Sequence, residues 1–487
     1  MNINPILIRK LTGLVSLIVG VALLPSAICA LIYGELHMVK IFLLIFAALA
    51  ALGLALFLPV RRSTHQIRTR DAFFIVTMCW ITASLAAAAP YCVSGVLPNY
   101  ADAFFEAVSN ITTTGANLIA SPETIPKSLL FWRSLISWIG GMGILLFVIS
   151  VLPALGIGTA NLANAETGGS SIEKYKLRLS ENAKYVYMLY ISLSAAEFLL
   201  LLAGRMNPFD ALLNTFSSIS NCGLSNYTEG ISYFNSVYIE IIIAIFCILG
   251  ATNFSTLQLL PRRKARVFLR EPEIRAYGFI IAFALVVITP VLLFARTYGS
   301  FADTVRNSFL QIISFVTTAG YSVINYNEWP VFCKMLLFFV LFIGGCSAST
   351  AGGIKVSRFL VMLMLIRRNL YKRLHPNAVY AVKIGERAIP ADKVSNITVF
   401  VIVYGVIFCA GSILLSLDGQ DMETTTGSVI AALSNTGLGF GAAGYGSTFE
   451  VFSVWGRSLL SVLMLLGRLE LFAFLILFTP SFWRGNR

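Results

Sequence analysis

Long apolar stretches recur along this chain, and they constrain its fold more than any other feature. A helix of about 20 apolar residues crosses the hydrocarbon core of a bilayer. Only 12% of the 487 residues are charged, about half the usual share in a soluble domain. The sequence therefore predicts an all-α integral membrane protein. Ten crossings are expected, near residues 11–34, 38–60, 72–93, 131–152, 183–203, 235–260, 276–296, 330–366, 394–416 and 451–479.

Basic residues cluster in the loops on one side of the predicted membrane. By the positive-inside rule these loops face the cytoplasm, and both termini fall on the same side. A nucleic-acid-binding protein needs one contiguous basic face, and the formal charge of +13 is not arranged in that way. The clusters are Arg61, Arg62, Arg68 and Arg70; Lys174, Lys176 and Arg178; Arg262, Arg263, Lys264, Arg266, Arg270 and Arg275; and Arg367, Arg368, Lys372, Arg373, Lys383 and Arg387.

Groups for catalysis or metal binding are sparse in the sequence. The eight cysteines form no CxxC pair and lie mostly in apolar stretches, where they are expected to pack as small side chains. There are only three histidines, and the sequence contains no HExxH or GxSxG motif. The segment Gly439–Gly444 fits GxGxxG but has no βαβ context. We predict that the chain is not an enzyme and holds no cofactor.

After a two-helix hairpin, one pattern repeats four times. Each unit has a long apolar helix, a short half-polar helix, a glycine-containing turn and a second long helix. Repeats of this kind indicate similar structural units. The predicted boundaries are 1–64 for the hairpin and 65–160, 161–263, 264–370 and 371–487 for the four units.

The four short segments align on one glycine. They read Thr112-Thr113-Thr114-Gly115, Ser220-Asn221-Cys222-Gly223, Thr317-Thr318-Ala319-Gly320 and Ser434-Asn435-Thr436-Gly437. Thirteen residues before each glycine stands a good helix-capping type: Asp102, Asp210, Asn307 or Thr424. We expect a short helix to begin at each cap and to end just before the glycine. The partial negative charge at its C-terminal end then favours a cation inside the membrane.

A glycine at this point permits backbone conformations that turn carbonyl oxygens toward one axis. Four such turns around a pseudo-fourfold axis can replace the hydration shell of a monovalent cation. A single TTTG segment is more simply explained as an interfacial loop, but four in register favour a filter for a monovalent cation. The predicted filter residues are Thr113, Thr114, Gly115, Asn221, Cys222, Gly223, Thr318, Ala319, Gly320, Asn435, Thr436 and Gly437.

The apolar stretch from 330 to 366 is longer than one crossing needs and contains a glycine-rich segment, residues 344–355. Broken helices are tolerated in membranes where they line a cavity, so this segment is predicted to be a gating loop beneath the filter. Close helix packing by glycines is the alternative; a phosphate-binding loop fails, because no strand precedes it. The gating residues are Gly344, Gly345, Gly352, Gly353 and Lys355.

Arg468 lies near the middle of the last predicted crossing, where burying it costs at least ~2.5 kcal/mol. We predict a gating or barrier role for it, with a structural ion pair as the alternative. Glu470 points elsewhere on the same helix and is expected to pair with another helix. Glu106, Glu197 and Glu240 are interpreted as packing or vestibule polar groups.

The four glycine turns and the glycine-rich segment resemble those of the TrkH/KtrB family of bacterial potassium uptake proteins, and the resemblance covers nearly the whole chain. It implies four fused potassium-channel-like modules in which Gly115, Gly223, Gly320 and Gly437 match the one constant filter glycine. Members with serine at the first of these positions discriminate less against sodium, so Gly115 favours potassium. The resemblance also implies an intramembrane gating loop and an arginine just below the filter.

Function, partners and location follow from the same resemblance as expectations. It implies potassium uptake across the bacterial cytoplasmic membrane by the TrkH/TrkG-like subunit of a Trk-type system, with K⁺ as transported ion and both termini in the cytoplasm. It implies a homodimer that binds nucleotide-binding TrkA or KtrA subunits, for which His375-Pro376-Asn377 is a docking candidate. A sodium-passing or ion-coupled (H⁺ or Na⁺) symporter remains the alternative.

Overall fold

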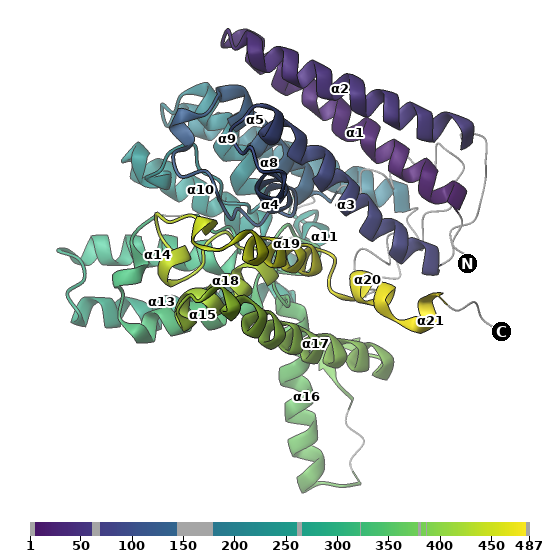
Figure 1. Ribbon diagram of the computed structural model, residues 1–487. Helices are drawn as coiled ribbons and strands as arrows, with labels where there is room; N and C mark the ends of the chain where they lie inside the picture. The colour runs from purple at the N-terminus through teal and green to yellow at the C-terminus, as the bar shows by residue number, and fades with distance from the viewer. Residues whose placement is uncertain are drawn as a thin grey trace.

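Helices form the framework of the protein, and the only strands in the described part are the two-residue β1 (Lys383–Ile384) and β2 (Arg387–Ala388). The computed structural model describes residues 5–60, 69–143, 179–260, 265–321, 323–377, 381–385 and 387–483. Figure 1 labels the elements. The long helices are α1 (Pro5–Ile32), α2 (Leu36–Phe57), α3 (Thr69–Val93), α8 (Leu179–Ala203), α13 (Pro272–Phe294) and α17 (Ala391–Leu415).

These six long helices are apolar enough to cross a membrane, and a seventh span exists if one bent pair of helices is counted. Large apolar side chains such as Val286 and Phe294 are exposed on them. Exposed apolar area of this extent marks a surface that contacts lipid or another protein. The all-α membrane architecture predicted from the sequence is confirmed.

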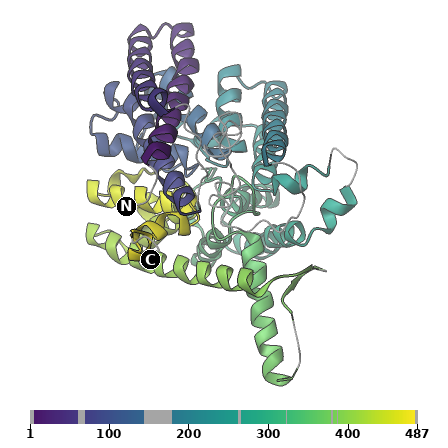
Figure 2. The same cartoon turned by 90° about the vertical axis from the view of Figure 1, so that its right-hand side faces the viewer.

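Two of the long helices, α1 and α2, form the predicted N-terminal hairpin, which lies along one side of the molecule (Figures 1 and 2). Its turn is tied to the first unit, because Glu35 accepts hydrogen bonds from the backbone N–H groups of Lys127 (2.7 Å) and Ser128 (3.1 Å). Lys127 and Ser128 are the first two residues of α5 (Lys127–Gly141). The Glu35 carboxylate therefore caps the N-terminus of α5 and complements its dipole. The hairpin therefore supports the first unit through a helix cap.

Each of the four units contains a first long helix, a short helix of 12 or 16 residues and a second helix of 13 to 15 residues. The short helices are α4 (Tyr100–Ile111), α9 (Pro208–Ile219), α14 (Phe301–Val316) and α18 (Met422–Leu433). The second helices are α5 (Lys127–Gly141), α10 (Val237–Gly250), α15 (Val331–Ile343) and α19 (Val454–Arg468). The other α-helices in the described part of the chain are α11 (Phe254–Leu257), α12 (Ala265–Arg270), α16 (Val356–Leu374), α20 (Phe472–Leu475) and α21 (Pro480–Trp483).

The predicted N-cap residues of the short helices are wrong. The caps are Asn99, Asn207, Ser300 and Asp421, and the side chains of the first three accept backbone hydrogen bonds. Asp102, Asp210, Asn307 and Thr424 lie inside the helices instead. Residue types that cap helices stand at both places in the sequence. The ones nearer the N-terminus are the caps, because each helix begins about one or two turns earlier than predicted.

The four units close into a ring. Each short helix packs against the second helix of the preceding unit: α9 against α5, α14 against α10, α18 against α15, and α4 against α19. Figure 2 looks toward the middle of this arrangement, where the turns gather among the helices. Three of these junctions have an ion pair, Arg306–Glu240, Lys334–Glu423 and Arg457–Asp102. The cyclic order gives the four units a pseudo-fourfold arrangement.

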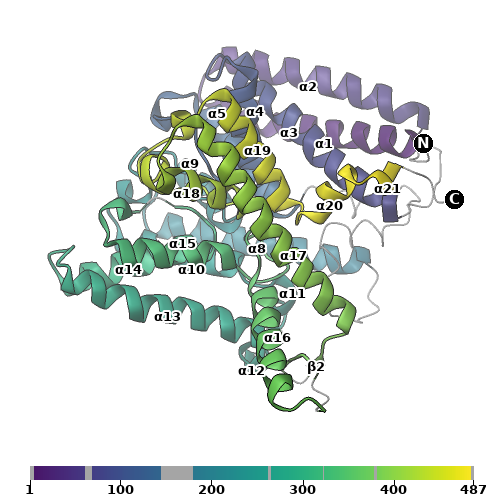
Figure 3. The same ribbon diagram turned by 60° about the horizontal axis from the view of Figure 1, so that its bottom comes forward.

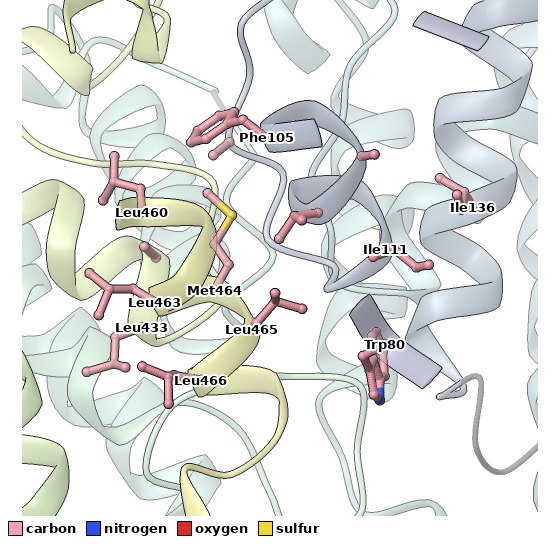
Figure 4. Packing of buried hydrophobic residues seen from close by; sticks show 14 of the residues in the cluster. Trp80, Phe105, Ile111, Ile136, Leu433, Leu460, Leu463, Met464, Leu465 and Leu466 are labelled. Carbon is pink, nitrogen blue, oxygen red and sulfur yellow. The ribbon is translucent and has the colours of Figure 1, made fainter. Parts of the chain in front are cut away.

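Apolar packing fills the junction that closes the ring. Leu460, Leu463 and Met464 of α19 lie in one buried cluster with Leu433 of α18 and Phe105 of α4 (Figure 4). All five side chains are 3% exposed or less. The last unit is thereby joined to the first through a continuous core.

The second helices are shorter than predicted, because they break near the level of the turns. α10 ends at Gly250 instead of continuing to 260, and the last crossing bends by 112° between α19 and the segment that begins at Phe472. α5 ends at Gly141; the rest of the predicted 131–152 crossing lies outside the described residues. Three of these helices have a glycine near their C-terminal end: Gly140 in α5, Gly250 in α10 and Gly467 in α19. Each glycine lies so close to the last carbonyl of the short helix in its own unit that a Cβ would not fit.

The third unit breaks as the sequence predicts. α15 ends at Ile343, residues 344–355 are non-helical, and α16 begins at Val356. α16 then projects away from the other helices (Figures 1 and 3), and its first half packs against β1. This gives the chain a projecting basic arm on the side of the predicted cytoplasmic loops.

Candidate ion pathway

The four glycine turns share one backbone geometry. Thr113, Asn221, Thr318 and Asn435 all have a left-handed conformation, with φ between 52° and 58°. In the first unit, Thr114 N–H donates to the Ser109 carbonyl (2.8 Å) and Thr113 N–H donates to the Asn110 carbonyl (3.1 Å). These two bonds are the pattern that ends a helix with a left-handed residue. The same pair of bonds ends α9 and α18, whereas in the third unit Thr318 N–H donates to the Phe315 carbonyl (3.1 Å) and Gly320 N–H donates to the Ser314 carbonyl (3.1 Å). Each short helix thus ends at a left-handed residue, with its C-terminus at the centre of the ring.

Two of the left-handed residues, Thr113 and Thr318, are β-branched. Such residues rarely adopt positive φ, and the strain amounts to about 1–3 kcal/mol each. Both side chains are buried, at 1% and 0% exposure. Strained backbone of this kind is held only where the surroundings determine it strongly, and it concentrates at functional sites.

The four predicted filter glycines meet in a closed ring. A Cβ on Gly115 would overlap the carbonyl oxygen of Cys222, and one on Gly223 would overlap the carbonyl oxygen of Ala319. A Cβ on Gly320 would lie 2.6 Å from the Gly437 nitrogen, and one on Gly437 would lie 2.6 Å from the Gly115 oxygen. Each turn therefore touches the next one in cyclic order, and the backbones approach so closely that a side chain at any of these glycines would force the turns to shift.

The outer side of this ring opens into one pocket, which all four glycines line. Its walls come from the segments that follow the turns, including Asn117, Ser225 and Tyr227, and from Arg133 of α5. A pocket of this kind leads directly to the ring and is the candidate ion entrance.

Beneath the ring lies the loop of residues 344–355, bonded directly to two of the turns. Gly352 N–H donates to the hydroxyl of Thr318 (2.8 Å), and the side-chain amide of Asn221 is hydrogen-bonded to the hydroxyl of Thr350 (3.1 Å). Thr350 in turn donates to the carbonyl of Gly250 at the end of α10 (2.9 Å). The loop therefore contacts the left-handed residues of units two and three.

Backbone conformation at both ends of this loop explains why the helix breaks there. Gly344 has φ 68° and Lys355 has φ 82°, and Lys355 N–H donates to the Ile343 carbonyl (2.8 Å). The Lys355 ammonium donates to the carbonyl of Ala351. Gly352 lies against the Ser434 carbonyl with no space for a Cβ. Glycines in this loop permit close contact with the ends of the short helices, and that contact places the loop under the ring.

Arg468 joins three units at the inner side of the ring. Its guanidinium donates to the carbonyl of Thr350 in the loop (3.0 Å) and to the carbonyls of Gly140 and Gly141 at the end of α5. A cation at a helix C-terminus complements the helix dipole. The arginine is thus held by backbone carbonyls of the first and third units.

Glu470, two residues beyond Arg468, forms an ion pair with Arg358 of α16, and the Arg358 guanidinium also lies 4.1 Å above the Phe400 ring. The expected contact of Glu470 with another helix is confirmed. Arg358, which lies within the predicted 330–366 crossing, was not identified as the partner from the sequence. Its place three residues after Lys355, one helical turn from the loop, was the available signal.

The other buried glutamates also have partners that the sequence did not identify. Glu106 is bonded to Arg133 (2.9 Å), Glu240 to Arg306 (2.7 Å), and Glu197 accepts a hydrogen bond from Ser218. The signal for Arg133 was its place as the single arginine inside the predicted 131–152 crossing, near the middle of α5. The predicted filter and loop residues are all brought together, while their roles in ion binding and gating stay predictions.

Comparisons with known proteins place the chain in one family. The TrkH family profile, described as a cation transport protein, matches residues 37–484. The chain is 36% identical over 484 residues to the Trk system potassium uptake protein TrkH of Salmonella typhimurium (strain LT2), covering 98% of this chain and 99% of the relative. It is 31% identical over 481 residues to the Trk system potassium uptake protein TrkG of Escherichia coli (strain K12), covering 98% of each.

A solved structure agrees with these sequence relatives. The crystal structure of the potassium transporter TrkH from Vibrio parahaemolyticus superposes with a TM-score of 0.87 at 34% identity, covering 98% of this chain and 99% of that one. The agreement extends over the hairpin and all four units. This chain is a multi-pass membrane protein and a member of the TrkH family of cation transport proteins.

Proposed function

We propose that this protein takes up potassium across the bacterial cytoplasmic membrane as the ion-translocating subunit of a Trk-type system, and that the four glycine turns are its filter. The single observation that carries the proposal is the closed ring of Gly115, Gly223, Gly320 and Gly437. Carbonyl oxygens from successive turns lie at this ring and can replace the water around a dehydrated cation. The C-terminal ends of four short helices add negative potential at the same place.

The loop of residues 344–355 and Arg468 form the gate in this proposal. Both lie against the inner side of the ring, and the loop is hydrogen-bonded to the turns of units two and three. Arg468 places a positive charge there, which opposes a cation until the guanidinium moves. Conduction requires the loop and Arg468 to move together, because the Thr350 carbonyl joins them.

The relatives named for the Trk system support a role within a Trk complex. We propose that the chain forms a homodimer and binds a TrkA- or KtrA-type nucleotide-binding subunit on its cytoplasmic face. The projecting arm formed by α16 has Lys372 and Arg373 in its last turn and ends beside His375. Both termini lie on this same side in the proposal, as the basic loops favour.

A sodium-passing or ion-coupled symporter is the second candidate. The same ring serves either mechanism, since a filter sets which ion binds and not what drives its movement. The turns are not identical, because Cys222 and Ala319 stand where the first and fourth turns have threonine. This difference makes ion preference the property that separates the candidates.

The test is rubidium uptake, with growth at low potassium, in bacteria that lack their own potassium uptake systems. The full-length protein, expressed with a TrkA-type subunit, is expected to restore growth and to give saturable rubidium uptake. Potassium should compete with rubidium far better than sodium does, and Gly115→Ser should narrow that preference. Well-expressed protein without rubidium uptake would overturn the proposal, while equal competition by sodium would favour the second candidate.

A further inference from the structure

One fully buried ion pair stands directly beside the ion entrance. Glu106 of α4 is 0% exposed and Arg133 of α5 is 2% exposed. The Arg133 Nε donates to a Glu106 carboxylate oxygen at 2.9 Å. Burying two charges is costly, and such a pair is weak evidence for stability by itself. Its position therefore calls for a reason other than stability.

Both members of the pair hold the chain that leaves the first filter turn. The second carboxylate oxygen of Glu106 accepts a hydrogen bond from Leu118 N–H (3.0 Å). Arg133 donates to the side-chain oxygen of Asn117 (3.0 Å), which also accepts from Ile119 N–H (2.8 Å). Asn117 stands two residues after Gly115. The pair thus fixes the backbone at the outer edge of the ring.

Arg133 also faces the ion path. It lines the pocket that contains all four glycines, and among the described residues lining that pocket it alone is charged. An uncompensated positive charge at this place would repel an entering cation. Glu106, bonded to the same guanidinium, supplies the compensating charge.

The pair is present in one unit only. Nine residues before the glycine, where the first unit has Glu106, the others have Asn214, Gln311 and Ser428. At the seventh residue of the second helix, where α5 has Arg133, the others have Ile243, Leu337 and Leu460. The other three units support their turns without a charge at these positions.

We propose that Glu106 and Arg133 are positioning residues that set the electrostatic potential at the entrance of the filter. Arg133 holds Asn117 at the edge of the ring, and Glu106 cancels the charge that this contact brings into the entrance. The proposal rests on the potassium uptake proposed above. It makes the apparent affinity for the entering ion depend on the balance of two charges.

If the charges of Glu106 and Arg133 compensate each other, neutralising each one alone should change the KM for rubidium in opposite directions. Glu106→Gln keeps the side-chain size and an oxygen for Leu118, but leaves Arg133 uncompensated, so the KM for rubidium rises. Arg133→Gln leaves Glu106 uncompensated, so the KM falls. At about 6 Å from the ion, one unit charge changes ion binding by about threefold in a water-like dielectric and by about a hundredfold in a surface-like one. The double variant removes both charges and returns the KM to near that of the wild type.

The experiment measures rubidium uptake kinetics by the full-length protein, with its membrane level quantified for each variant. KM values that move in opposite directions and return in the double variant support the proposal. A pair that is merely structural gives lower maximal uptake or KM changes of the same sign in both single variants, and this result overturns it. Arg133→Lys keeps the charge, so its KM should stay within about twofold of the wild-type value; a KM shift as large as that of Arg133→Gln also overturns it.

The Arg306–Glu240 pair is the matched control. It joins α14 to α10 and does not line the pocket. Glu240→Gln should leave the KM for rubidium within about twofold of the wild-type value. If a Glu106 or Arg133 single variant does not accumulate, the double variant and Arg133→Lys decide the question by their KM values. If the wild-type protein takes up no rubidium, the proposed potassium uptake fails. If the wild type takes up rubidium but both single variants shift the KM in the same direction, only the proposal for Glu106 and Arg133 fails.

Discussion

The guanidinium of Arg468 donates a hydrogen bond to the carbonyl oxygen of Thr350 at 3.0 Å, although the two residues are 118 positions apart in the chain. Thr350 belongs to the loop beneath the four glycine turns, and its hydroxyl is bonded to the Asn221 side chain in the second turn. The arginine is also bonded to the carbonyls of Gly140 and Gly141. One side chain therefore connects the loop to the end of α5.

Replacing Arg468 by alanine is expected to release the loop. Hydrogen bonds from a charged group contribute about 1.5–3 kcal/mol each, so losing even one shifts the open–closed balance by about tenfold or more. Rubidium flux in vesicles without a regulatory subunit should rise by that order, and Arg468→Lys should lie between alanine and the wild type. Flux of Arg468→Ala that equals the wild-type flux at equal protein level would remove Arg468 from the gate.

Replacing Gly353 by valine is expected to change opening without changing ion preference. Gly353 has φ 78°, and a Cβ there would lie 2.9 Å from the Gly344 Cα, so the loop must rearrange. The loop lies beneath the turns and contributes none of the ring glycines, so the potassium preference should persist. Gly405→Ala is the control, because no atom lies within 4 Å of a Cβ at that position. If Gly353→Val lost the potassium preference while its rubidium flux stayed unchanged, the loop and not the glycine turns would set ion preference, which would contradict the account.

The repeat made much of this architecture predictable from the sequence. Four short segments that align on one glycine predict four turns around one axis, and Gly115, Gly223, Gly320 and Gly437 do meet. The break between Ile343 and Val356 was predictable because the segment is too rich in glycine to stay helical. These features depend on local residue types, which a single sequence displays directly.

The parts that were not predictable depend on tertiary contacts. The last crossing breaks after Arg468, and Glu470 and Leu471 have φ values of 50° and 60°, although Glu and Leu are both good helix formers. The partner of Glu106 lies 27 residues away on another helix, beyond the reach of any periodic pattern. Pairings of this kind are fixed by how the units close on one another.

The Arg358–Glu470 pair is expected to stabilise the break between α19 and α20. Arg358 is 6% exposed and Glu470 is 20% exposed, so removing one partner leaves a largely buried charge and costs about 3 kcal/mol. Glu470→Gln should lower the unfolding temperature of the purified protein, and Arg358→Met/Glu470→Gln should recover part of the loss. Lys334→Met is the control, because Glu423 in that pair is 43% exposed and such pairs contribute about 0–1 kcal/mol. Equal losses for Glu470→Gln and Lys334→Met would contradict this expectation.

Glu123 provides a pH-dependent contact at the outer rim. Burial raises the pKa of its carboxyl, but hydrogen bonds from Thr228 outweigh burial, and the pKa lies below the ordinary value of 4.5. A depressed pKa means that the contact stabilises the folded state above pH 4.5, and this stability is lost as the pH falls through the folded pKa. The unfolding temperature of Glu123→Gln should therefore be lower than that of the wild type at pH 7 and should converge with it in acid. A difference that is constant with pH would contradict the assignment.

The central claim is that the four glycine turns bind the transported ion, and anomalous diffraction from crystals grown in rubidium tests it most directly. The account predicts rubidium peaks on the axis enclosed by Gly115, Gly223, Gly320 and Gly437, which weaken when potassium replaces rubidium and persist in sodium-containing buffer. Peaks that lie only elsewhere, in protein that takes up rubidium, would contradict the account.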